Sequence, residues 1–190
     1  MSSHHIVREN QEPALFIADP HCLQEGYLHQ LLEWSPTIIT LAQHYEHLQS
    51  LQIKVDVLLA KEEVSGMDLE EHLQVVSYGD SSPTAALFTY LHSKNNYAVN
   101  ILTNDEQISS YIPFLSDFTI ILLNDRGKHL LVRKYEKWLP KGFVLGIAGL
   151  EDITDLENLE AISDGKFTVR ADGFVRITEQ PHYFRITEEL

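Results

Sequence analysis

The sequence predicts an N-terminal α/β domain with a mainly parallel sheet, followed by a smaller antiparallel β-sandwich domain. Between residues 14 and 60, short apolar runs rich in β-branched residues alternate with segments whose apolar side chains recur every three or four positions. After Pro113 the pattern changes to short β-like runs separated by turn residues. We therefore expect residues 1–113 to form the α/β domain and residues 114–190 the β-sandwich domain.

The first domain is expected to alternate strands and helices. The spacing predicts strands at residues 14–19, 37–42, 53–60, 74–78 and 97–105, and helices at residues 22–34, 44–52, 67–73 and 81–94. Pro36 ends the first helix, whereas Ser82 is a plausible N-cap with Pro83 at the first helical position of the last one. This order is typical of a parallel sheet with crossover helices.

The second domain is expected to be almost wholly β. Short runs are predicted at residues 117–125, 128–136, 143–150, 166–173, 174–180 and 183–190. Asn-Asp-Arg-Gly, Pro-Lys-Gly, Asp-Gly and Gln-Pro turns separate them. Residues 154–162 alone suggest a helix or a loop within this series.

Charge and composition restrict the class of protein. The formal net charge is -14, and residues 1–125 carry four basic against seventeen acidic side chains, which argues against nucleic-acid binding there. Six of the fourteen basic residues fall within residues 126–141, either as an anion contact or as a solvated hairpin face.

There is no run of eighteen apolar residues and no apolar core for a signal peptide near the start, so we expect a cytoplasmic protein without membrane contact. Cys22, the one cysteine, is expected to be an inert thiol.

The segment IKVDVLLAKEEV, residues 53–64, is a buried strand that runs directly into charged residues. In an open parallel sheet, the residues just past a strand's carboxyl end face the ligand crevice. Lys61, Glu62 and Glu63 are therefore the first candidates for a functional site.

The same segment, extended to residues 51–64, is similar to the strand L-G-I-K-P-D-V-I-I-G-D-F-D-S of the thiamine pyrophosphokinase family, and the order of elements resembles that family over most of the chain. The resemblance implies a Rossmann-like α/β domain, a β-sandwich and a homodimer. It also implies Mg²⁺-dependent transfer of diphosphate from ATP to thiamine, giving thiamine diphosphate and AMP, with no permanently bound cofactor.

The chain departs from the family at the positions that carry this chemistry. Lys61 and Glu63 stand where the family has its two metal-binding aspartates, and Pro83 replaces a third carboxylate. The family's double glycine, its Arg-Leu-Asp-His stretch and its Ser-Asn-Glu motif have no counterpart. In this register, the resemblance implies Glu63 and Asp80 as catalytic residues, Glu62, Glu63 and Asp80 as magnesium ligands, and Gln43, His44, Lys61 and Ser82 as ligand-binding residues.

Two functions follow as hypotheses. The first is a divergent thiamine pyrophosphokinase-like protein, a pseudoenzyme with weakened or lost activity, since phosphoryl transfer depends on positioning and charge neutralisation. The alternative is a non-catalytic protein that keeps the fold for assembly or for binding a small ligand such as thiamine or a nucleotide.

Some residues allow two interpretations. His44 and His47 could hold zinc or lie at the surface, and Asp80 could be functional or a helix cap. Trp138 could stack on a flat ligand or anchor a hairpin.

Overall fold

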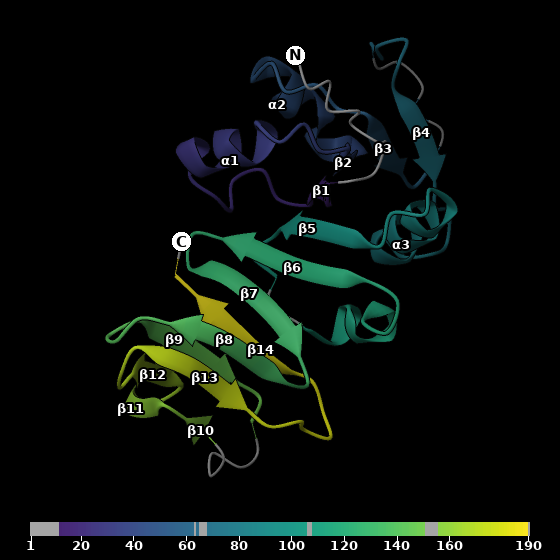
Figure 1. Ribbon diagram of the computed structural model, residues 1–190. Helices are drawn as coiled ribbons and strands as arrows, with labels where there is room; N and C mark the ends of the chain where they lie inside the picture. Colours follow the sequence, from purple (N-terminus) through teal and green to yellow (C-terminus); the bar gives the residue numbers. More distant parts are fainter. Residues whose placement is uncertain (1–11, 63, 65–67, 106–107, 151–155, 190) are drawn as a thin grey trace, which may run out of the picture.

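Most strands of the molecule belong to one twisted sheet, which has a parallel half and an antiparallel half (Figure 1). The computed structural model describes residues 12–62, 64, 68–105, 108–150 and 156–189. Within them, eleven strands form the large sheet in the order β11-β12-β9-β14-β7-β6-β5-β1-β2-β3-β4, and β10-β13-β8 form a second sheet.

The parallel half contains the strands of the expected α/β domain and one more. Its strands are β1 (Ala14–Ile17), β2 (Ile38–Leu41), β3 (Val57–Ala60), β4 (Gln74–Ser77), β5 (Ala98–Leu102) and β6 (Thr119–Asn124). All neighbours among these six are parallel. Strand β6 lies beyond the predicted boundary at residue 114, yet it pairs in parallel with β5 and antiparallel with β7.

Helices cover both faces of the parallel half, which is why β1, β2 and β3 are largely apolar on both sides. These helices are α1 (Glu25–Leu32), α2 (Tyr45–Ser50) and α3 (Pro83–Ser93), with the short 3₁₀ helices η1 (Ala42–His44), η2 (Ile108–Ser110) and η3 (Ile112–Phe114). Helix α3 packs on one face through Leu87, Phe88 and Leu91, whereas α1 and α2 pack on the other through Leu28 and Leu48. No helix among the described residues is both long and apolar enough to cross a membrane.

The antiparallel half forms one layer of a two-layer structure. The remaining strands are β7 (Gly127–Val132), β8 (Tyr135–Leu139), β9 (Val144–Ala148), β10 (Leu156–Glu157), β11 (Leu159–Ser163), β12 (Lys166–Val169), β13 (Gly173–Ile177) and β14 (Phe184–Glu188). Buried residues of β8 and β13 pack against those of β9, β12 and β14 between the two sheets. This arrangement agrees with the expected antiparallel second part.

Two segments for which the sequence suggests a helix contain none among their described residues. Residues 68–73, expected to be helical, contain no helix. The described part of residues 154–162, expected to be helix or loop, belongs to β10 and β11 apart from residue 158. The first segment is too short to form a helix without tertiary support. In the second, β11 gains that support as a strand, because Leu159 is buried in the core between the two sheets.

A buried polar contact joins the two layers of the antiparallel part. The Tyr135 hydroxyl on β8 donates to Glu188 on β14 at 2.9 Å, and the Lys137 ammonium donates to the same carboxylate at 2.7 Å. Tyr135 and Glu188 are each 6% exposed. Burial, and then the nearby charge of Glu188, raises the pKa of the Tyr135 phenol.

We predict that Tyr135→Phe lowers the free energy of unfolding by about 1–3 kcal/mol at pH 7, because it leaves a buried carboxylate with one donor fewer. Because folding raises the pKa of Tyr135, its neutral phenol stabilises the folded state at pH values below the ordinary tyrosine pKa of about 10. This stabilisation is lost as the pH rises above that value. The difference between the two proteins should therefore shrink above pH 10. Urea denaturation at several pH values measures it, with Tyr97→Phe, a partly exposed tyrosine, as control. An equal loss in that control would contradict the prediction.

Candidate functional site

The carboxyl ends of β2, β3 and β4 bring most of the predicted site residues to one edge of the sheet. Gln43 and His44 follow β2 in η1, Lys61 and Glu62 follow β3, and Asp80 lies in the turn after β4. Glu63 lies outside the described residues. The residue types expected at a crevice therefore share an edge, as the topology requires.

The backbone at this edge is held in place by hydrogen bonds. The Gly79 amide donates to the Lys61 carbonyl at 3.2 Å, and the Tyr78 amide donates to the Ala60 carbonyl at 3.0 Å. Gly79 has a φ of +52°, a conformation that glycine adopts without a Cβ penalty. The turn after β4 is thus fixed against the end of β3, while the side chains of Lys61, Glu62 and Asp80 are exposed.

Two of the polar side chains already have structural partners. Ser82 is the N-cap of α3, and its Oγ accepts a hydrogen bond from the Ala85 amide at 3.1 Å. Asp56, which fits the family strand, accepts one from the Ile38 amide at 2.8 Å and so joins β3 to the start of β2. Both therefore have a structural role.

The described residues do not fit a magnesium ion at this edge. Magnesium prefers hard oxygen ligands in a tight octahedron, whereas Lys61 offers a competing cation and Pro83 offers no side-chain oxygen. Among the described residues, no three His, Cys, Asp or Glu side chains gather closely enough to hold a metal ion.

The histidines do not converge on one centre either. The His44 ring lies 3.1 Å from the side-chain nitrogen of Gln43, whereas the His47 ring packs against His21, with 4.6 Å between ring centroids. The zinc interpretation of His44 and His47 therefore gains no third ligand from the described residues.

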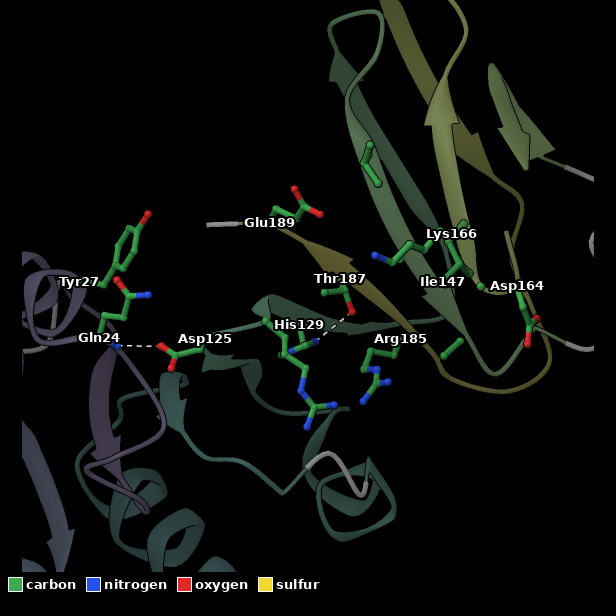
Figure 2. A pocket seen from close by; sticks show the side chains of 15 residues that line it. Gln24, Tyr27, Asp125, His129, Ile147, Asp164, Lys166, Arg185, Thr187 and Glu189 are labelled. Atoms are coloured by element: carbon green, nitrogen blue, oxygen red, sulfur yellow. Dashed lines mark hydrogen bonds between the residues drawn. The ribbon is translucent and has the colours of Figure 1, made fainter. Parts of the chain in front are cut away.

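A cleft of about 760 Å³ lies elsewhere in the molecule (Figure 2). One side is formed by Gln24 and Tyr27 at the start of α1 and by the β6–β7 turn, while the other is the outer face of the antiparallel half. The backbone amide of Gln24 donates a hydrogen bond to the Asp125 carboxylate at 2.8 Å and so joins the start of α1 to that turn. None of the predicted site residues that the structure describes lines this cleft.

A buried histidine organises the cleft floor. The Asn124 Oδ1 accepts from the Arg126 amide at 3.0 Å and also lies 2.9 Å from His129 Nε2, so Nε2 must be the donor. In the neutral ring, Nδ1 then accepts from the Thr187 hydroxyl, 3.0 Å away. Sequence reasoning missed this network, because His129 and Thr187 meet only through the pairing of β7 with β14.

Two further sequence predictions can be placed. Cys22 is 1% exposed, and burial followed by the charge of Asp19 raises its pKa to about 12, which agrees with an inert thiol. Trp138 is 55% exposed on β8, where its cross-strand partner is Phe174 of β13. It lies outside the cleft.

We predict that Ser82→Ala lowers the free energy of unfolding by about 0.5–2 kcal/mol, because the Ala85 amide loses its cap. Ser81→Ala is a matched control, since the Ser81 hydroxyl donates to a carbonyl three residues earlier and caps no helix. Chemical denaturation measures both. A loss no larger than that of Ser81→Ala would contradict the capping role and leave Ser82 available as a ligand contact.

Comparison with known proteins gives a structural match alone. No family model matches the chain, and no curated protein does. A probable thiamine pyrophosphokinase from Staphylococcus saprophyticus superposes with a TM-score of 0.64 at 8% identity, covering 94% of this chain and all of the other. The thiamine pyrophosphokinase from Bacillus subtilis has a TM-score of 0.63 at 10% identity, covering 94% of this chain and 99% of the other. The thiamin pyrophosphokinase from Geobacillus thermodenitrificans has a TM-score of 0.58 at 8% identity, covering 94% of this chain and 98% of the other.

Proposed function

We propose that this chain, which has the fold of thiamine pyrophosphokinases, is a divergent relative in which transfer of diphosphate from ATP to thiamine is weakened or lost. The observation that carries the proposal is the exposed ammonium group of Lys61 directly after the carboxyl end of β3. In the predicted register of the family strand, this residue takes the position of a metal-binding aspartate. Transfer requires neutralisation of the phosphate charge, and an ammonium group cannot hold the magnesium ion that supplies it.

The surrounding positions support the same conclusion. Ser82 uses its oxygen to cap α3, and Pro83 carries no carboxylate. Glu62 and Asp80 remain as exposed oxygen donors, which alone make a weak set for magnesium. A residual activity, if present, would use Glu63 and Asp80 at the metal and Lys61 at a phosphate.

The first test is a calorimetric titration of the purified protein with thiamine and with a non-hydrolysable ATP analogue, each with and without Mg²⁺. Formation of thiamine diphosphate from ATP is assayed in the same samples. We expect no magnesium-dependent binding of the ATP analogue and little or no product. Turnover in the range of ordinary kinases, about 1–100 s⁻¹, would overturn the proposal.

We further predict that the double variant Lys61→Asp, Pro83→Asp raises thiamine diphosphate formation by about tenfold or more, because it restores two carboxylates at the strand ends. Lys54→Asp makes the same charge change as the Lys61→Asp part of the double variant, at an exposed position before β3, and should leave the rate unchanged. No gain in the double variant would contradict the register in which Lys61 and Pro83 occupy acidic positions.

A second candidate function is non-catalytic binding of a small ligand. The cleft between α1 and the antiparallel half favours it, because its volume lies within the range of small-molecule sites and it does not depend on the strand ends. Homodimerisation is part of this proposal, and sedimentation of the purified chain tests it.

A further inference from the structure

The cleft has as many basic as acidic side chains in its lining, whereas the protein as a whole is strongly acidic. Three of its lining residues are Arg126, Lys166 and Arg185, although the chain as a whole carries a net charge of -14. They come from the β6–β7 turn, the start of β12 and β14, which are far apart in the sequence. The fold therefore concentrates cations here that the sequence disperses.

The cations are arranged around the polar floor of the cleft. Arg185 and Thr187 project from the same face of β14, since they are two residues apart on one strand. Figure 2 shows Lys166 extending from β12 on the side of Thr187. Lys166 forms no ion pair with the residues that the structure describes, so its charge is available to a ligand.

The shape of the floor admits a ligand close to the sheet. Gly146 on β9 lies opposite Thr187, and a Cβ atom at this position would come within 3.0 Å of the Thr187 Cβ. A larger residue would therefore be crowded against Thr187, whereas glycine leaves backbone exposed beside the hydroxyl. On the opposite side, Tyr27 is 37% exposed and offers a ring to the body of a ligand.

Three carboxylates also line the cleft, equal in number to its basic side chains. Asp125 already accepts the Gln24 amide, and Figure 2 shows Asp164 at the far end of the β11–β12 hairpin. Glu189 lies at the end of β14. Lys166 is therefore the cation beside Thr187 for which the described residues supply no carboxylate partner.

We propose that this cleft binds a small organic anion, whose phosphate or carboxylate group is held by Arg126, Lys166 and Arg185. Guanidinium groups bind both kinds of oxyanion in a bidentate manner, and an ammonium group adds a point charge. This inference deepens the second proposed function, small-ligand binding, and it requires neither magnesium nor diphosphate transfer.

The test is calorimetric titration of the full chain with sodium diphosphate and with citrate, without Mg²⁺ and at constant ionic strength. We expect at least one of these anions to bind. Diphosphate alone would assign a phosphate ligand, and citrate alone would assign a carboxylate. If neither diphosphate nor citrate bound, the proposal would be overturned.

Three variants locate the bound anion. Arg185→Gln and Lys166→Gln should each weaken binding by about tenfold, because each removes a charge-assisted contact. Lys134→Gln removes the same charge at an exposed position in the β7–β8 turn, outside the cleft, and should change the affinity less than about twofold. Equal weakening in all three variants would show general attraction and overturn the site. If Arg185→Gln does not fold, Lys166→Gln, at an exposed position, decides the result.

Thiamine serves as a cationic competitor in the same titrations. We expect that thiamine does not displace the anion. If thiamine displaced it from the original protein but not from Lys166→Gln, the proposal that the cleft selects anions would be overturned. Diphosphate transfer is measured separately with ATP and Mg²⁺. Active transfer would therefore refute the first proposed function without affecting the result for the cleft.

Discussion

The backbone hydrogen bonds on the two edges of β6 hold the parallel and antiparallel halves in one sheet. The turn that follows β6 is narrow, and Gly127, with a φ of +139°, passes close to the Glu188 carbonyl of β14. Asn124 supports this turn by accepting the Arg126 amide and by donating to the Thr103 carbonyl at 3.2 Å. Both the strand-end edge and the cleft take their positions from this junction.

The two candidate sites differ in what the fold provides. At the strand ends, the topology supplies a crevice-facing edge, but its side chains include an ammonium group and a helix cap in place of a set of oxygen ligands. At the cleft, the outer face of the sheet supplies a volume, a buried histidine network and three cations. Conservation of a fold does not require conservation of its original site. A chain can therefore keep one architecture while its binding chemistry moves to another face.

Much of the fold could be predicted from the sequence, because its strands and helices carry strong local signals. Ser82 and Pro83 correctly marked the start of α3, and the resemblance to thiamine pyrophosphokinases is confirmed at the level of the fold. The cleft could not be predicted in the same way. Period-two alternation assigns side chains to faces of a strand, but it does not say that Lys166 of β12 and Arg185 of β14 will share an outer face with β9 between them. The Lys61 assignment depends on register alone, and it stays a prediction.

The strand order also affects how the chain folds during synthesis. Strand β1 lies between β2 and β5, so its second edge remains unpaired until residues 98–102 have been made. Strand β5 in turn has one unpaired edge until β6 has been made, and β6 completes the parallel half. Because such distant pairings are slow to form, the apolar β1 is exposed to wrong partners on the ribosome for longer than a strand paired by a local hairpin. Strand β1 therefore stays open to mispairing until β5 has been made, and a chaperone that covered its free edge would protect it during that time.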